Sequence, residues 1–179
     1  VQKTLGNVDF RKEERFYKKI SESLVPPYGF SSVWCFSRQE SMIDEYIVNY
    51  SNYAGLGSGS IGYVEGICYA NTFDIEDYIR RVDSGVIPVM ASRKFGVKEQ
   101  VRYEFLMSIF GMALDLQALR ERFGKELDSY IWQIILPFYM AGALRYDSGK
   151  FYPTARGRYL AVVMMREFFT AVNNFRDFC

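Results

Sequence analysis

The spacing of apolar residues divides the chain near Arg93. Upstream of this point, the pattern predicts helices over residues 9–24 and 75–82 and strands over residues 30–37 and 47–56. The Pro26-Pro27-Tyr28-Gly29 segment is expected to end the first helix. Asp74 is a suitable N-cap for the second helix, and Gly85 lies just past its end. Helix, strand, loop and strand in this order are what the last part of a (β/α)-type barrel would give.

Downstream of Arg93 the pattern becomes helical. It predicts helices over residues 97–112, 116–123, 127–140 and 155–178, and a hairpin over residues 143–153. Gly124 closes the second of these helices, and Pro137 predicts a kink or an early end in the third. Three helices, a hairpin and a closing helix resemble a winged-helix arrangement. The chain is therefore predicted to be α/β (α+β), with one domain over residues 1–93 and another over residues 94–179.

The segment from Gly55 to Tyr63 contains four glycines within eight residues. Glycine loses more backbone entropy on folding than alanine, so this composition indicates positive φ angles or a close approach of backbone to a ligand. A tight turn between two strands would need the same residues. Two phosphate-binding motifs are excluded, because residues 63–71 read as extended chain where a dinucleotide-binding loop needs a helix, and a Walker A lysine is absent.

Five weak motifs follow one another in a recognisable order and spacing. They are the Gly55–Tyr63 segment, the Tyr69-Ala70-Asn71 segment, the Gly85-Val-Ile-Pro88 step, the Leu114-Asp115 and Arg122-Phe123-Gly124 pairings, and the Thr154-Ala-Arg-Gly157-Arg158 segment. In this order, from about Tyr17 to Arg176, the chain resembles the oxygen-independent coproporphyrinogen III oxidase family of radical S-adenosylmethionine (SAM) enzymes. The resemblance implies the C-terminal end of a partial radical SAM barrel over residues 1–93, and a helical, winged-helix-like domain over residues 94–179 that covers the substrate.

The resemblance also implies two cofactors, S-adenosylmethionine and a 4Fe-4S cluster. Gly57, Gly59, Ser60 and Ile61 match the glycine-rich strand end that contacts SAM in the family, with Ile61 against the adenine. The alternative for Ile61 is an ordinary core position. The family's Cys-x-x-x-Cys-x-x-Cys motif is missing, since Cys35, Cys68 and Cys179 are too far apart for any iron–sulfur or zinc spacing. We therefore expect no metal ligand and no catalytic residue in this chain. It would be either the C-terminal part of a longer enzyme that holds the cluster ligands, which we favour, or a degenerate relative that lost its cluster.

A tetrapyrrole substrate carries carboxylates, which favour arginine partners, and a conjugated ring, which favours aromatic neighbours. Arg102 and Tyr103, near the start of the helix predicted from residue 97, and Arg93 at the domain junction are the candidate substrate contacts. Residues of these types are more often ordinary surface or packing residues. Arg156, Arg158 and Arg166 form a modest basic group on the last predicted helix, which we interpret as a solvated face.

Composition and charge narrow the function classes. Hydrophobic residues make up 49% of the chain and aromatic residues 17%, which is ample for a core. The net charge is +1, and residues 125–140, which would be the recognition helix of a DNA-binding domain, contain one lysine and no arginine. Nucleic acid is therefore not an expected partner. No apolar run reaches the length of a membrane span. Three dispersed cysteines favour a reducing, cytoplasmic setting.

The function predicted from these observations is that of the C-terminal portion of a radical SAM oxidoreductase of the coproporphyrinogen dehydrogenase type. The tetrapyrrole would be coproporphyrinogen III or haem, and the parent enzyme would need an electron donor. This portion alone is predicted to be inactive. Two alternatives stay open: a haem chaperone or an anaerobic haem-degrading methyltransferase on the same scaffold, and a non-catalytic winged-helix-like module that docks a partner protein. The sequence does not distinguish the reaction or the oligomeric state.

Overall fold

In the computed structural model, residues 8–38 and 52–176 are described. They form an α+β fold in which helices dominate and the strands are short. The helices are α1 (Phe10–Leu24), α2 (Ile75–Asp83), α3 (Val97–Phe110), α4 (Leu116–Phe123), α5 (Glu126–Met140) and α6 (Ala155–Arg176). The strands are β1 (Gly29–Phe30), β2 (Phe36–Ser37), β3 (Ile61–Val64), β4 (Ile67–Asn71), β5 (Val89–Lys94), β6 (Leu114–Asp115), β7 (Leu144–Asp147) and β8 (Lys150–Pro153).

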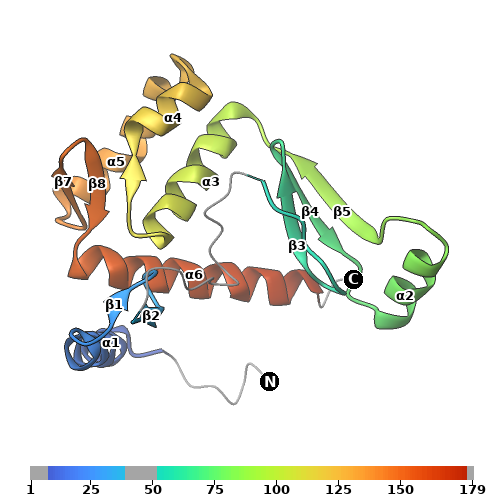
Figure 1. Cartoon of the computed structure of the whole chain (residues 1–179), viewed down its shortest axis with the longest axis horizontal. Helices are drawn as coiled ribbons and strands as arrows, with labels where there is room; N and C mark the ends of the chain where they lie inside the picture. Colours follow the sequence, from blue (N-terminus) through green and yellow to red (C-terminus); the bar gives the residue numbers. More distant parts are fainter. Residues whose placement is uncertain (1–7, 39–51, 177–179) are drawn as a thin grey trace.

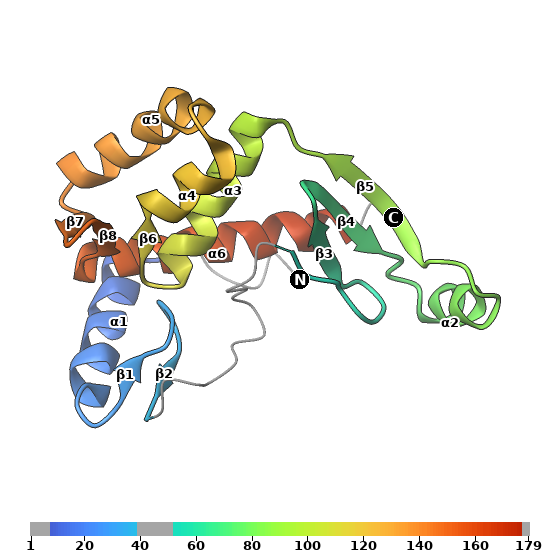
Figure 2. The ribbon, with the colours of Figure 1, turned by 45° about the horizontal axis from the view of Figure 1, so that its top comes forward.

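Figures 1 and 2 show that these elements gather into two parts joined through β5 and α3. One part holds the β3-β4-β5 sheet, with α2 at its outer end. The other holds α3, α4 and α5 with the β6-β8-β7 sheet. Helix α6 packs against α3, and α1 with the β1-β2 hairpin lies on another side of α6. The point near Arg93 where the apolar pattern becomes helical therefore coincides with the passage of the chain from the β3-β4-β5 sheet into the helices.

Every strand pair in residues 8–38 and 52–176 is antiparallel. The barrel end expected for residues 1–93 would contain parallel strands. No strand pair of the described residues is parallel, so the barrel end stays a prediction. The single strand predicted over residues 30–37 is wrong, because β1 and β2 are two-residue strands of one small hairpin. Ser32 Oγ causes the reversal by accepting hydrogen bonds from the backbone N–H groups of Trp34 (3.4 Å) and Cys35 (3.1 Å).

The strand predicted over residues 47–56 falls partly outside the described residues. Residues 52–56, which are described, form no strand and contribute one isolated bridge, between Tyr53 and Tyr63. The hairpin predicted around Asp147 and Gly149 is confirmed. Ser148 (φ 50°) and Gly149 (φ 86°) both adopt positive φ, the geometry of the two-residue turn that matches strand twist.

The predicted helices are confirmed, with small changes at their ends. The Asp9 carboxylate caps α1 by accepting from the N–H groups of Arg11 and Lys12, and Asp74 caps α2 through Asp77 N–H at 2.8 Å. The early end predicted at Pro137 is wrong. Helix α5 continues to Met140, and the N–H of Ala141 donates to the Pro137 carbonyl at 3.0 Å. Residues 177 and 178, which the prediction included in the last helix, lie outside the described residues.

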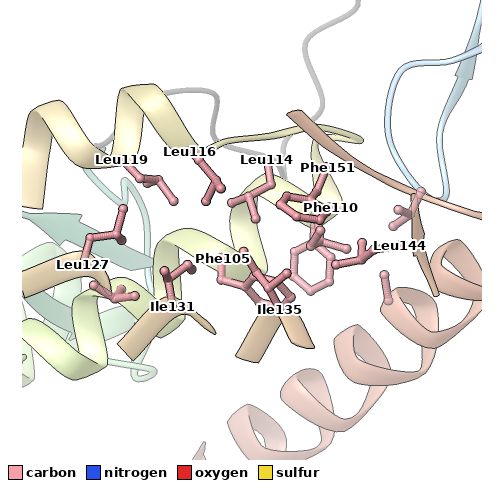
Figure 3. Packing of buried hydrophobic residues seen from close by; sticks show 14 of the residues in the cluster. Phe105, Phe110, Leu114, Leu116, Leu119, Leu127, Ile131, Ile135, Leu144 and Phe151 are labelled. Carbon is pink, nitrogen blue, oxygen red and sulfur yellow. The ribbon is translucent and has the colours of Figure 1, made fainter. Parts of the chain in front are cut away.

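The hydrophobic core lies between the helices of residues 97–165 and the β6-β8-β7 sheet (Figure 3). Helix α5 contributes Leu127, Ile131 and Ile135, which are spaced by four residues and are at most 1% exposed. Phe105 and Phe110 meet them from α3 (Figure 3). Burying one such side chain stabilises the fold by about 1.5–3 kcal/mol, so this cluster supplies the largest share of the packing energy.

The interface between α1 and α6 depends on arginines that the sequence suggested were solvated. Arg166 of α6 binds both carboxylate oxygens of Glu13 at 2.6 Å, and Glu13 also accepts the Tyr159 hydroxyl at 3.0 Å. The Arg158 guanidinium stacks on the Phe30 ring at 4.3 Å. The interpretation of a solvated basic face is therefore wrong for Arg158 and Arg166. Only Arg156 of the three is exposed.

Candidate functional site

The glycine-rich segment lies against the end of β4 rather than projecting from the fold. The N–H of Gly59 donates to the Thr72 carbonyl at 2.8 Å, and the N–H of Asn71 donates to the Ser60 carbonyl at 2.9 Å. Ser58 Oγ donates to the carbonyls of Thr72 (3.1 Å) and Phe73 (2.9 Å). The segment is thus joined to the strand end by both backbone and side-chain hydrogen bonds.

Asn71 is the organising residue of this loop. Its side chain is 3% exposed, and its amide nitrogen donates to the carbonyls of Gly55 (3.1 Å) and Gly57 (3.2 Å) and to Ser60 Oγ (2.9 Å). Ser60 Oγ in turn donates to the Gly57 carbonyl at 2.7 Å. A buried amide with all of these partners fixes one loop conformation, because any other would leave its polar atoms unsatisfied.

Three of the loop glycines are required by the protein's own packing. A Cβ on Gly62 would lie 2.2 Å from the Tyr69 ring, and one on Gly59 would lie 2.7 Å from the Phe73 ring. A Cβ on Gly55 would lie 2.5 Å from the carbonyl oxygen of Ile61. Gly57 differs, because no atom lies within 4 Å of its Cβ position, while its φ of +102° is positive like that of Gly59. Only at Gly57 does the loop leave open space in front of a glycine.

The backbone donors of this loop are largely used internally. Gly55 N–H donates to the Tyr69 hydroxyl at 3.1 Å, and Gly57 N–H donates to the Tyr78 hydroxyl of α2 at 3.0 Å. Ile61 begins β3 opposite Ala70 and is half-buried. A ligand here would meet a prearranged surface made of the open side of Gly57 and the side chain of Ile61, with few free N–H groups. That surface suits a flat, apolar ring better than a phosphate.

Tyr103, a predicted substrate contact, lies inside an aromatic cluster. Its ring stacks on Tyr63 with centroids 4.2 Å apart, and its hydroxyl shares a 2.7 Å hydrogen bond with Tyr53. Phe95 closes the cluster against both Tyr63 and Tyr103. Burial raises the pKa of Tyr103 strongly, and the pKa of Tyr53 is also raised by burial. Tyr103 therefore packs the sheet against α3.

The two predicted substrate arginines lie near this cluster but on the surface. Arg93 is exposed on β5, forms an ion pair with Glu99 and lies over the Phe95 ring at 6.0 Å. Arg102 is exposed on α3. The structure thus places both Arg93 and Tyr103 next to Phe95, with Arg102 adjacent to Tyr103 in the chain.

An aromatic groove was missed by the sequence analysis. It holds about 500 Å³ between α4, α5 and the β7-β8 hairpin. Its lining residues are Leu116, Arg120, Trp132, Ile135, Leu136, Tyr139, Tyr146 and Phe151. Trp132, Leu136 and Tyr139 form a second apolar stripe on α5, beside the buried one, and they stay 42–54% exposed. This second stripe is the feature of the sequence that could have predicted the groove, because a helix with one buried face needs only one apolar stripe.

The described part of the chain contains no group of three or more cysteine, aspartate or glutamate side chains that could hold a metal ion. Cys35 and Cys68 are half-buried free thiols, and burial raises the pKa of Cys68. A raised pKa keeps this thiol protonated at neutral pH, which weakens it as a ligand or nucleophile. Cys179 lies outside the described residues. The cysteines present do not fit a 4Fe-4S cluster.

Comparisons with known proteins give one similarity. No family model and no curated protein matches the chain. Among solved structures, the chain is similar to coproporphyrinogen III oxidase (HemN) from Escherichia coli, which is described as a radical SAM enzyme. The TM-score is 0.45 and the identity 16%, over 70% of this chain and 28% of that one. A similarity of this size assigns no function to the chain. Separately, none of the helices in residues 8–38 and 52–176 is long and apolar enough to span a bilayer.

Proposed function

We propose that this chain forms the C-terminal portion of a radical SAM oxidoreductase that acts on a tetrapyrrole, of the coproporphyrinogen III oxidase type. In this proposal, the part that ends with β5 contributes to the SAM pocket. The helices and the β6-β8-β7 sheet form a winged-helix-like domain that covers the substrate. The order α3, β6, α4, α5, β7, β8 and the antiparallel sheet support the winged-helix part of the proposal.

The observation that carries the proposal is where the family-like motifs fall in the fold. Three of them lie at a junction whose backbone depends on a glycine. Gly85 follows α2 with a φ of +69°, and Gly124 ends α4 with a φ of +58°. Gly157, in the first turn of α6, has no room for a Cβ, which would lie 1.9 Å from the Ala143 carbonyl oxygen. Motifs that each fix a junction support a shared architecture rather than a chance match of short patterns.

The proposed SAM contacts are Gly57, Gly59, Ser60 and Ile61. Gly57 offers the open backbone surface, and Ile61 offers an apolar side chain at the start of β3. Gly59 and Ser60 would act indirectly, by holding the loop in place, because Gly59 packs on Phe73 and Ser60 is hydrogen-bonded to Asn71. When bound, SAM would supply the radical precursor. The role of this chain is to position the adenine and to keep water from it.

The cluster is assigned to no residue of this chain, because its cysteines do not fit one. The predicted substrate contacts Arg93 and Arg102 remain proposals as surface cations that could meet substrate carboxylates. Tyr103 is proposed only as support for them, since its hydroxyl is bonded to Tyr53.

The SAM pocket can be tested on this chain by calorimetric titration with SAM. Replacing Ile61 by Val removes one methylene from the proposed adenine contact, which is worth about 0.8 kcal/mol, or about fourfold in affinity. The matched control is Ile67→Val, at the other end of the β3-β4 pair, where the side chain is 41% exposed. If the two variants bind SAM with equal affinity, Ile61 is not part of the SAM site.

The reaction is tested separately, on the full-length parent enzyme with its cluster reconstituted anaerobically. With SAM, a reductant and coproporphyrinogen III or haem, the proposal expects loss of two carboxyl groups from coproporphyrinogen, detected by mass spectrometry. A methylated, ring-opened haem would assign the haem-degrading alternative. Haem that stays bound and unchanged, with unchanged coproporphyrinogen, would assign the chaperone alternative and refute the proposed chemistry.

One observation favours a second candidate, the non-catalytic docking module. The aromatic groove exposes Trp132, Leu136 and Tyr139 together, and exposed aromatic clusters of this kind mark sites where proteins bind partners. This candidate expects the partner to quench Trp132 fluorescence and the Tyr139→Ala variant to lose that response. Binding of SAM by the chain, weakened by Ile61→Val, would instead support the enzyme.

A further inference from the structure

A second hollow lies between α1 and the first turn of α6 and holds about 640 Å³. Its α6 side carries Arg156, Arg158 and Tyr159, and its α1 side carries Tyr17 and Lys18. None of these residues belongs to the site proposed for SAM or to the aromatic groove. The hollow therefore needs its own explanation.

The two arginines of this hollow have no carboxylate partner among the described residues. Arg156 is exposed and makes no ion pair or hydrogen bond within residues 8–38 and 52–176. Arg158 Nη1 donates a long hydrogen bond to the Pro153 carbonyl at 3.4 Å, its guanidinium also interacts with the Tyr17 hydroxyl, and its buried Nε has no hydrogen-bonding partner there. Arg166, on the same helix, is paired with Glu13, although its Nη2 is also buried without a hydrogen-bonding partner in the described residues. A buried guanidinium nitrogen without a partner is costly, and a bound anion would remove that cost.

The other charges of the hollow leave an excess of positive charge. Its carboxylates are Glu14 and Glu22, both on α1. Glu22 is paired with Lys18 at 3.8 Å. Three cations against two carboxylates leave one positive charge, and the arginines concentrate it on the α6 side. The N-terminal end of α6 also carries a partial positive charge from the helix dipole, which adds to this excess.

The remaining walls are apolar except for Ser21, whose hydroxyl donates to the Tyr17 carbonyl at 2.9 Å. The rings of Tyr17 and Tyr159 lie 6.1 Å apart at an interplanar angle of 42°. Both hydroxyls are engaged inside the protein: Tyr17 donates to the Val33 carbonyl, and Tyr159 donates to the Phe10 carbonyl at 2.8 Å. The hydroxyls are therefore committed, and the half-buried Tyr17 ring and Leu160 offer most of the carbon surface, since Tyr159 is only 7% exposed. A ligand that fits has an anionic group at one end and a flat apolar body at the other.

We propose that this hollow is a binding site for an aromatic carboxylate, with the carboxylate between Arg156 and Arg158 and the ring against Tyr17, Tyr159 and Leu160. A carboxylate between two guanidiniums accepts charge-assisted hydrogen bonds, which are about twice as strong as neutral ones. The proposal is independent of the proposed enzyme function, because it uses no residue assigned to SAM or to the tetrapyrrole.

The test is a calorimetric titration of the whole chain with naphthalene-2-carboxylate, and with naphthalene-2-methanol as the neutral analogue. We expect one site for the carboxylate, an affinity at least about tenfold weaker for the alcohol, and weaker binding at high salt. Arg156→Gln and Arg158→Gln should each weaken carboxylate binding about tenfold. The matched control is Arg120→Gln, which removes an exposed arginine beside the aromatic groove and should leave the affinity unchanged.

Arg158→Gln also removes the stacking on Phe30, so its folding is checked by circular dichroism. Arg156 is exposed and unpaired, so its variant decides the question if Arg158→Gln unfolds. The proposal is overturned if the carboxylate and the alcohol bind equally. It is also overturned if Arg120→Gln weakens binding while Arg156→Gln does not, because the ligand would then occupy the aromatic groove.

Discussion

Gly157 is the position where one added methyl group should do most harm. A Cβ there would lie 1.9 Å from the carbonyl oxygen of Ala143, 2.9 Å from its carbonyl carbon and 3.2 Å from Pro153 Cβ. The nearest atoms belong to backbone, which has no rotamer that could move them away. The same carbonyl accepts the Thr154 N–H at 2.9 Å, the hydrogen bond that seats the start of α6 on the chain before β7. Gly157→Ala must therefore displace α6 from Ala143.

Two opposing terms set the magnitude. In an open helical position, alanine would stabilise the helix by about 1 kcal/mol relative to glycine. Here the clash requires a shift of about 1 Å, and overpacking of this kind costs roughly 1–3 kcal/mol. Loss of the Thr154–Ala143 hydrogen bond adds about 1 kcal/mol. The clash and the lost hydrogen bond outweigh the propensity gain, and we expect a net destabilisation of about 2 kcal/mol.

The assay is thermal unfolding followed by circular dichroism at the helix band. For a chain of this size, 2 kcal/mol corresponds to a fall in Tm of about 4–8 °C. The control is Gly29→Ala, because a Cβ on Gly29 meets only the Ser37 carbonyl, at 3.9 Å, and its φ is not positive. That variant should change stability by less than about 0.5 kcal/mol. A Gly157→Ala variant as stable as the control would show that α6 does not approach Ala143 as described.

Two further predictions concern the tyrosines. Tyr103→Phe and Tyr53→Phe should each lower the free energy of unfolding by about 1 kcal/mol, because each leaves the other hydroxyl of their 2.7 Å hydrogen bond without its partner. The double variant should cost less than the sum of the two, so additive urea-unfolding energies would refute the pairing. Burial and the Glu13 carboxylate raise the pKa of Tyr159 to about 12, above its ordinary value of 10. The folded state therefore holds this proton more tightly, and the resulting stability is complete below pH 10 and is lost as the pH rises from 10 to 12. Tyr159→Phe should lose less stability over that range in urea titrations, and an equal loss would contradict the assignment.

Local patterns were sufficient to predict the helices and their ends. Helix spacing, the Asp74 cap and the turn at Ser148-Gly149 depend on residues within one or two turns of each other. Their physical causes act over short sequence distances, so the sequence alone contains them. The β1-β2 hairpin was missed although it is also local, because its reversal depends on one serine hydroxyl rather than on glycine or proline.

Contacts between distant segments could not be predicted in the same way. Arg158 and Arg166 were interpreted as part of a solvated basic face on the last helix. Their partners, Phe30 and Glu13, lie more than 120 residues earlier in the printed sequence. Only the packing of α1 on α6 brings them together. The hollow between these helices could not be anticipated for the same reason.

The glycine-rich segment shows why a site predicted from composition needs a structural test. The sequence indicated that four closely spaced glycines serve either a turn or a ligand. The rings of Phe73 and Tyr69 already require Gly59 and Gly62, so these two glycines carry no information about a ligand. Substituting either would rearrange the loop and abolish binding of any ligand there, whatever its identity. Only Gly57, with its open face, and Ile61, which can lose a methylene without moving the backbone, report on binding itself. Since any side chain at Gly57 is strained by its positive φ, Ile61 is the residue on which the proposed SAM contact can be decided.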